Sequence, residues 1–327
     1  MSATADDLTL SQADDEYPHP TRDTPLWSEN YAWVSYDATS QIGLFIHIGR
    51  APHNPSLWRG TTVALLPGGE HLVSKTLGAG VDPRQPGNTT LHGECEEPTV
   101  RWRLRHDGPA LRTTRDAVST RLVHDGEPAT LTYDVTFEQL HPVWDLTDWM
   151  REQAWGHAHI EQGGTLKGTV TVDGVEHRYD AVGIRDHTLG PRNFASLNRT
   201  CWAFAAFPSG RVACALRVWS PDDDVVLDKG YVYVDGEMRF SEPGELPTVT
   251  SADGAPHDFH IEVGGERITG EVQTSTAFML EEPNDLLVGT DPGREDMKVI
   301  VEAPCKYTWG DEVGHGWLER SRRIDQL

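Results

Sequence analysis

The sequence predicts an all-β protein in which two antiparallel β domains, each a barrel or a sandwich, follow one another with little helix. Apolar and polar residues alternate with a period of two, rather than about 3.6, through most of the chain. Short turn sequences, above all Asp-Gly, separate these alternating runs. The length of 327 residues is sufficient for two domains or for one large β structure.

Predicted hairpins follow one another along the chain. Asp-Gly turns occur at 107–108, 125–126, 173–174, 235–236 and 253–254. The alternation is clearest in GTVTV-DG-VEHRYD and GYVYV-DG-EMRF. Further strand pairs are predicted around the turns PGG, PSG and GG at 67–69, 208–210 and 264–265, and within 31–50. A long Gly/Pro-rich loop is expected at 77–98, inside the first domain.

A short predicted helix interrupts this rhythm near the middle of the chain. The stretch DLTDWMREQ, residues 145–153, has Asp145 or Thr147 as its capping residue. Such an interruption is typical of a domain junction. We therefore expect a loose acidic leader at 1–18, an N-terminal β-barrel domain at 19–152 and a C-terminal β-barrel domain at 153–327.

The charge of the chain argues against two classes of partner. The net charge is −23, with 51 acidic and 28 basic residues, and such a field repels nucleic-acid phosphates and anionic lipid surfaces. No apolar run approaches the roughly 20 residues of a membrane span, and no secretory signal opens the chain. These features predict a cytoplasmic protein with no integral membrane segment; self-association into a homo-oligomer is compatible with them.

The cysteines and the known cofactor motifs are equally informative. Cys95, Cys201, Cys214 and Cys305 lack CxxC spacing, so four reduced thiols are expected, with a disulfide between Cys201 and Cys214 as the minor alternative. The sequence contains no glycine-rich phosphate loop, G-x-S-x-G elbow or HExxH motif. Nucleotide cofactors and serine-hydrolase chemistry therefore have no support.

The first candidate site is WGHAHIEQGG, residues 155–164. On a strand, His157, His159 and Glu161 project from the same face, and Trp155 begins that face. Two imidazoles and a carboxylate could be metal ligands. They could equally form a solvent-facing polar side or a hydrogen-bonding group inside a pocket, and periodicity does not choose between these interpretations.

The second candidate is VGIRDHTLGPRNF, residues 182–194. We expect the strand to leave its sheet near Asp186 and His187, close to the apolar and aromatic strand NRTCWAFAAF. Apolar surroundings would raise the pKa of Asp186 and make it a proton donor, which His187 could orient or relay. Alternatively, Arg185 or Arg192 pairs with Asp186 in a structural salt bridge.

The third candidate is GHGWLERSRR, residues 314–323. As a closing strand it presents His315, Trp317, Glu319 and Ser321 on one face. The basic residues around them most simply balance a local carboxylate patch, and a contribution to a site is the second interpretation.

Residues 155–194 resemble the core of a bacterial family of two-domain lipocalin-like (calycin-like) proteins. The family pattern is close to a His-x-Glu-Gln strand, a G-T-V hairpin and an R-D-H-S-W-G-x-R turn. The N-terminal half is similar more loosely, through IGLFIHIGRAPHNPSLWRG. The family is distantly similar to carotenoid 1,2-hydratases (hydroxyneurosporene synthases) and to lipocalin-like cyclases. The resemblance implies two tandem barrels with a hydrophobic ligand site between or within them.

The resemblance also implies an activity. Asp186 and His187 match the pair that holds the alkene-protonating acid in the hydratases, whereas Leu189 replaces the Trp that relatives usually carry, which bears on pocket shape. The implied function is a cofactor-independent hydratase or dehydratase, or an isomerase or cyclase. It would act on an alkene of a hydrophobic, terpenoid-like substrate through a tertiary carbocation.

In this scheme Asp186 is the acid, and His187, His157 or Glu161 positions or deprotonates the water. The residues expected to contact substrate are Trp155, His159, Arg192, Trp202, Trp219 and Trp317, with aromatic faces stabilising the cation. No redox or nucleotide cofactor and no metal is needed. Two alternatives remain: a non-catalytic lipocalin-like protein that binds a hydrophobic metabolite, and a metal-dependent enzyme using His157, His159 and Glu161.

Overall fold

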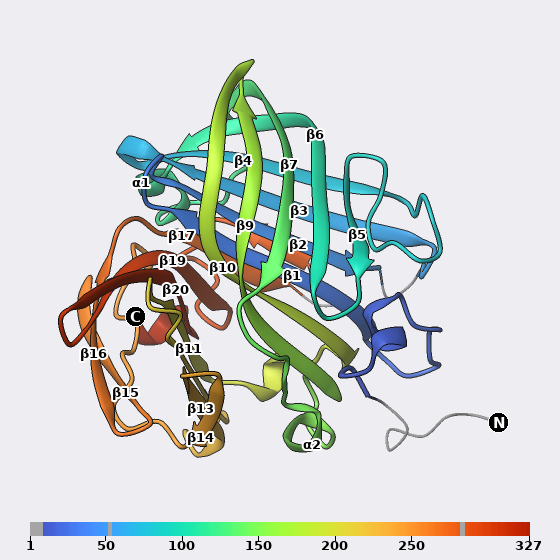
Figure 1. Cartoon of the computed structure of the whole chain (residues 1–327). Coiled ribbons are helices and arrows are strands. Elements are labelled where there is room, and N and C mark those ends of the chain that lie inside the picture. The colour runs from blue at the N-terminus through green and yellow to red at the C-terminus, as the bar shows by residue number, and fades with distance from the viewer. Residues whose placement is uncertain (1–8, 52–53, 282–284) are drawn as a thin grey trace.

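The computed structural model describes residues 9–51, 54–281 and 285–327, and within these ranges the chain is nearly all β. The strands form two ten-stranded antiparallel sheets, one from the first part of the chain and one from the last (Figure 1). The predicted all-β class with two tandem barrel-like units is therefore confirmed. Among the described residues, no helix has both the length and the apolar character needed to cross a membrane.

The first sheet closes into a barrel. Its path is β10-β1-β2-β3-β4-β6-β7-β9-β8, and β9 also pairs with β10, which joins the two ends; β5 pairs with β6. Its strands are β1 (Trp27–Asp37), β2 (Ile42–Arg50), β3 (Leu57–Leu66), β4 (Glu70–Ala79), β5 (Leu91–Glu97), β6 (Arg101–Thr114), β7 (Glu127–Gln139), β8 (Trp144–Asp145), β9 (Ala158–Val172) and β10 (Val175–Pro191).

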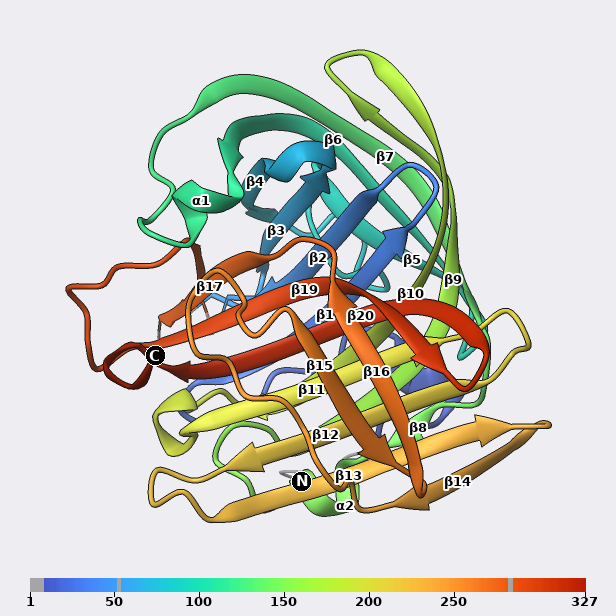
Figure 2. The ribbon, with the colours of Figure 1, turned by 90° about the vertical axis from the view of Figure 1, so that its left-hand side faces the viewer.

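The second sheet is an open, strongly curved half-barrel with the path β14-β13-β12-β11-β20-β19-β16-β15; β17 pairs with β18 and β19. Figure 2 shows it beneath the first sheet, where β20 contacts β1 and β10. Its strands are β11 (Arg199–Ala206), β12 (Val212–Trp219), β13 (Val225–Val234), β14 (Glu237–Ser241), β15 (Asp258–Val263), β16 (Glu266–Val272), β17 (Thr276–Glu281), β18 (Asp285–Val288), β19 (Lys298–Trp309) and β20 (Glu312–Arg323).

Helix is limited to single turns in the described ranges. The α-helical turns are α1 (Arg115–Val118) and α2 (Thr147–Met150), and the 3₁₀ turns are η2 (Ala13–Glu16), η3 (Pro67–Gly69), η4 (Phe194–Ser196) and η5 (Ile324–Gln326). The helix predicted at 145–153 is therefore shorter than expected. The N-cap of α2 is Leu146, so neither Asp145 nor Thr147 is the capping residue; Asp145 belongs to β8, and its Oδ1 accepts the Thr147 backbone N–H at 2.8 Å.

The predicted Asp-Gly turns divide into two groups. Those at 173–174 and 235–236 join β9 to β10 and β13 to β14, with both central residues at positive φ, as a type I′ turn requires. The prediction at 107–108 is wrong, because these residues lie inside β6, which pairs continuously with β7. Residues 125–126 lie in the long connection that joins β6 to β7 through α1, and residues 253–254 lie in the loop between β14 and β15, so neither pair forms a tight hairpin turn.

The boundary between the two units lies later in the chain than predicted. The first sheet ends at Pro191 and the second begins at Arg199, so the division does not fall between residues 152 and 153 as predicted. The reason is the β9–β10 hairpin: β9 pairs with β7 and β10 pairs with β1, so this hairpin completes the first barrel.

The leader predicted at 1–18 is also corrected where it is described, from residue 9 onward. Leu10 and Glu16 are fully buried. Glu16 accepts two hydrogen bonds from the Arg185 guanidinium, at 2.6 and 2.8 Å, and one from Trp102 Nε1 at 2.9 Å. A buried ion pair therefore holds this segment against the barrel interior. Residues 1–8 lie outside the described residues.

The three largest apolar cores support this architecture. One fills the first barrel around Trp33 and Trp102, and another lies inside the second sheet around Tyr307. The largest lies between the two sheets and includes Trp202 and Trp317. The four cysteines are free thiols, as expected.

Candidate active site

A cavity of about 180 Å³ lies between the two sheets. Strands β1, β2, β9 and β10 supply one wall, and β11, β12 and β17 to β20 supply the other. Apolar side chains dominate it, among them Val34, Phe45, Trp155, Trp202, Leu216 and Ile300. Its charged or titratable residues are His47, His159, Glu161, Asp186, Arg192, Lys298, Glu302 and Glu319. A mainly apolar, concave space containing a few polar groups is the usual form of a small-molecule site.

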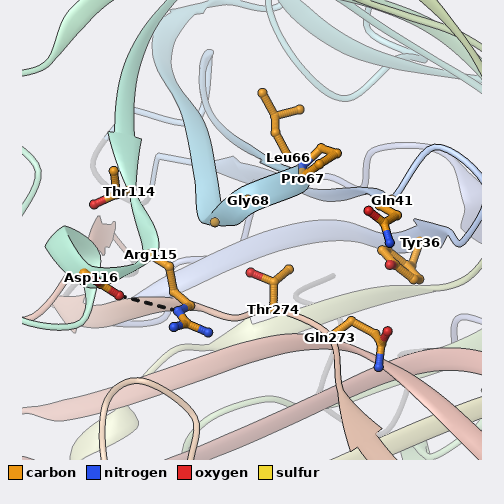
Figure 3. Close-up of a pocket in the computed structure, with 11 residues that line it drawn as sticks. Tyr36, Gln41, Leu66, Pro67, Gly68, Thr114, Arg115, Asp116, Gln273 and Thr274 are labelled. Atoms are coloured by element: carbon orange, nitrogen blue, oxygen red, sulfur yellow. Dashed lines mark ion pairs between the residues drawn. The ribbon is translucent and has the colours of Figure 1, made fainter.

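A second hollow at the sheet interface is larger, about 470 Å³, and polar (Figure 3). Turns and strand ends line it, including Gln41, Pro67 and Gln273. Its charged lining residues, Arg115 and Asp116, pair with each other at 3.6 Å. It contains none of the residues that the sequence singled out, so the smaller apolar cavity is the better candidate.

Asp186 faces the apolar cavity from the C-terminal part of β10, between its strand partners Ala32 on β1 and Glu161 on β9. It is half-buried. The Thr188 hydroxyl lies within 3.5 Å of Oδ1, a long hydrogen bond. Burial raises the pKa of Asp186 to about 6. The nearby Glu161 carboxylate also raises this pKa, whereas His159 and Arg192 lower it. These conditions match those expected of a proton donor.

The predicted salt-bridge alternatives do not involve Asp186. Arg185 pairs with Glu16 inside the barrel, and Arg192 donates from Nη1 to the Trp155 carbonyl at 2.8 Å. Within the described ranges, no ion pair includes Asp186. Arg192 nevertheless lines the cavity, and burial there lowers its pKa to about 10.

The structure separates His187 from Asp186, contrary to the expectation that the two act together. The strand does not leave the sheet at this point; β10 continues to Pro191, and successive side chains on a strand point to opposite faces. His187 is fully buried on the barrel side, where Nε2 bonds Glu29 Oε1 at 3.1 Å and the ring stacks on Tyr31 at 3.9 Å. His19 Nδ1 also bonds Glu29, at 2.9 Å, so this network anchors the N-terminal segment.

His159 and Glu161 form a hydrogen-bonded pair on the cavity wall. His159 Nε2 lies 3.2 Å from Glu161 Oε1, and His159 Nδ1 lies 2.7 Å from the Thr188 hydroxyl. Burial opposes a charge on His159, but the Glu161 bond and the Glu161 and Asp186 carboxylates together raise its pKa. Trp202 Nε1 and Cys214 Sγ donate to Glu161 Oε2 at 2.9 and 3.4 Å.

The metal-site alternative is not supported by the geometry. His157 precedes β9, is half-buried and does not line the cavity. Among the described residues, the groups whose ligand atoms lie within 4.8 Å of one another do not include His157, His159 and Glu161. The expected common strand face therefore begins only at His159.

Two of the four tryptophans that were expected to contact substrate line the cavity, and two do not. Trp155 and Trp202 line the cavity. Trp219 lies in the core of the second sheet with Arg199 and Arg217 against its ring, so it is outside the cavity. Trp317 is fully buried beside the cavity and donates from Nε1 to Glu302, which lines it.

Sequence reasoning missed Glu302 and Lys298 and did not select Glu319. Glu302 is a lone carboxyl group within the apolar run VIVEAPC of β19, which was an available signal for a buried polar group. Glu319 and Ser321 share a face of β20 and line the cavity, as the alternation of 314–323 indicated. Lys298 donates to the backbone carbonyls of Phe194 and Leu197.

Comparison with solved structures identifies relatives of the fold. A Nitrosomonas europaea protein described as an AttH superposes with a TM-score of 0.62 at 12% identity, covering 90% of this chain and 91% of that chain. Kievitone hydratase from Nectria haematococca gives 0.56 at 14% identity, covering 91% and 90%. CghA with Sch210972 gives 0.55 at 12% identity, covering 91% and 89%.

These likenesses confirm the resemblance to hydratases and lipocalin-like proteins at the level of the fold. No curated protein matches the sequence. A family model matches almost the whole chain, residues 12–324, and on that match the protein belongs to the family described as a domain of unknown function, DUF7064.

Proposed function

We propose that the cavity between the two sheets is the active site of a cofactor-independent hydratase or dehydratase acting on an alkene of a hydrophobic, terpenoid-like substrate. One observation carries the proposal: Asp186 faces a mainly apolar cavity, and burial raises its pKa to about 6. A carboxyl group in that state can protonate a carbon–carbon double bond. A fold shared with kievitone hydratase makes hydration the reaction to test first.

The chemistry needs only the protein's side chains and water. The Asp186 carboxyl proton adds to one alkene carbon, and the other carbon becomes a tertiary cation. Water then forms the C–O bond, and its surplus proton passes to a carboxylate in the cavity. The faces of Trp155 and Trp202 stabilise the cation by about 0.5–2 kcal/mol each. Isomerisation or cyclisation would follow if the cation lost a proton or closed a ring before water added.

The remaining polar residues support this reaction. Glu161 accepts hydrogen bonds from His159, Trp202 and Cys214, so its carboxylate is held in place and does not compete for the water. Its negative charge lies beside the position of the cation. His157 and His187 are outside the cavity and have no direct role in this scheme.

The size of the cavity restricts how the substrate binds. About 180 Å³ is less than the roughly 300–1,000 Å³ typical of pockets that enclose a whole ligand. We therefore expect the branched alkene end of the substrate to enter the cavity, with the remainder extending between the sheets.

The test uses water labelled with oxygen-18 and two probes, 2-methylbut-2-ene and a prenyl-substituted phenol. The expected product is a tertiary alcohol that carries the label, detected by mass spectrometry. Asp186→Asn keeps the side-chain shape but removes the acid, and should abolish product. Asp180→Asn, an exposed position on the same strand, is the matched control. Equal turnover by Asp186→Asn and wild type would reject the mechanism. Binding of the probes without product would favour a non-catalytic binding protein.

A further inference from the structure

Two glutamates lie side by side on the cavity wall formed by the second sheet. Glu302 on β19 and Glu319 on β20 are direct cross-strand partners, and both line the cavity. Glu302 is 4% exposed and Glu319 is half-buried. Trp317 Nε1 donates to Glu302, and the Thr200 hydroxyl donates to Glu319 Oε1 at 3.1 Å. As direct cross-strand neighbours on the cavity face, the two carboxyl groups lie close together, so that a charge on both at once is unfavourable and a retained proton on one of them relieves the repulsion.

The charges around the cavity support a shared proton. Its four carboxyl groups are Asp186, Glu161, Glu302 and Glu319, and its cationic side chains are Arg192 and Lys298. The carboxyl groups therefore outnumber the Arg and Lys side chains, and one proton kept on the glutamate pair lowers the cost of this excess negative charge in a mostly buried site. Burial, together with the charge of neighbouring carboxylates, raises the pKa of both glutamates.

Asp186 lies on the opposite wall from the pair. It belongs to β10 of the barrel, whereas the pair belongs to the half-barrel. The negative charge of Asp186 contributes to raising the pKa of both glutamates. The charge of Arg192 interacts electrostatically with Asp186 and with Glu319. A small substrate group between the walls would therefore have one acid–base group on each side.

We propose that the Glu302–Glu319 pair is the acid–base group for the substrate oxygen, with Asp186 serving the substrate carbon. This assignment rests on the proposed function and extends it. In dehydration, the proton of the pair moves to the hydroxyl oxygen, the C–O bond breaks and water leaves. The resulting cation loses a C–H proton to the Asp186 carboxylate as the double bond forms. In hydration, Asp186 protonates the carbon and the pair takes the surplus proton of the added water.

The protonation states of the free enzyme at neutral pH are those that dehydration requires. At neutral pH the pair holds a proton and most Asp186 is ionised, because its pKa is about 6. The site is then prepared to remove water from a tertiary alcohol. The substrate class is thus a tertiary alcohol and its alkene partner, with the hydroxyl group directed toward β19 and β20.

An infrared measurement tests the shared proton without a substrate. Wild-type protein in D₂O at neutral pH should show the C=O stretch of a buried protonated carboxyl group. Glu302→Gln and Glu319→Gln should each lose this band, while Asp186→Asn should retain it. Circular dichroism identifies the variants that fold, and either glutamate variant is sufficient. A wild-type spectrum without the band, or a band that survives in a folded glutamate variant, overturns the proposal.

Isotope exchange tests the division of roles, using 2-methylbutan-2-ol and 2-methylbut-2-ene as probes. Glu319→Gln should slow oxygen-18 exchange of the alcohol by about a hundredfold or more, yet retain deuterium uptake from D₂O into the alkene. Asp186→Asn should show the reverse pattern. Loss of both exchanges in both variants overturns the separate roles given to the glutamate pair and Asp186, but leaves the proposed function standing. A wild-type protein that exchanges neither isotope overturns the proposed function itself.

Discussion

Asp186→Asn should stabilise the folded protein at neutral pH, because the aspartate carries a charge where burial disfavours one. The ordinary pKa of 3.8 rises to about 6 in the folded state. Since one pKa unit corresponds to about 1.4 kcal/mol, ionisation costs the folded state about 3 kcal/mol at about pH 7.5. This is an upper limit, because the side chain is half-buried and solvent screens part of the effect.

The sign of the pH dependence follows from the raised pKa. The neutral carboxyl group supports folding fully below the unfolded-state pKa, and this support is lost as pH rises through the folded-state pKa. The advantage of Asp186→Asn should therefore shrink to about 1 kcal/mol at about pH 4.5.

Urea unfolding at the two pH values, followed by tryptophan fluorescence, measures this difference. Asp180→Asn is the control, because Asp180 is exposed on the same strand and its ion pairs with Lys167 and Arg178 are screened by solvent. A destabilised Asp186→Asn, or a gain that is the same at both pH values, would show that the carboxyl group is not held in an unfavourable environment. The acid assignment would then lose its physical basis.

Three further outcomes are expected. The kcat/KM for hydration should fall as pH rises above about 6, because only protonated Asp186 donates to the alkene; a pH–rate profile with the alkene probe measures this. Glu16→Gln should cost about 3–5 kcal/mol in urea unfolding, because it leaves the buried Arg185 guanidinium without its counter-charge; a loss below about 1 kcal/mol would mean that the N-terminal segment is not anchored. Gly163→Ala should cost about 1–3 kcal/mol by thermal unfolding, since its Cβ would lie 2.6 Å from Phe204 of the other sheet.

Local patterns were sufficient to predict the class of the fold. The period of two is a property of strands themselves, and the Asp-Gly turns at 173–174 and 235–236 have the positive φ angles that these residues favour. The same pattern at 107–108 failed because pairing of β6 with β7 along its length outweighs a local turn preference.

Long-range pairing decided where the two units meet. Nothing local distinguishes the β9–β10 hairpin from a hairpin of the second unit. Its assignment to the first barrel depends on contacts with β1 and β7, which are distant in sequence. The same applies to Glu16, whose partner Arg185 lies at the far end of that barrel's sequence.

The candidate site shows the same division. The sequence by itself determined the all-β class and pointed to Asp186 as a carboxyl group near apolar surfaces, because alternation and composition are readable residue by residue. Only the tertiary structure decided that His187 faces away, that Trp219 belongs to another core, and that Glu302 and Glu319 meet opposite Asp186. Which side chains share a cavity depends on how two separate sheets pack, and that packing arises from many weak contacts between distant segments.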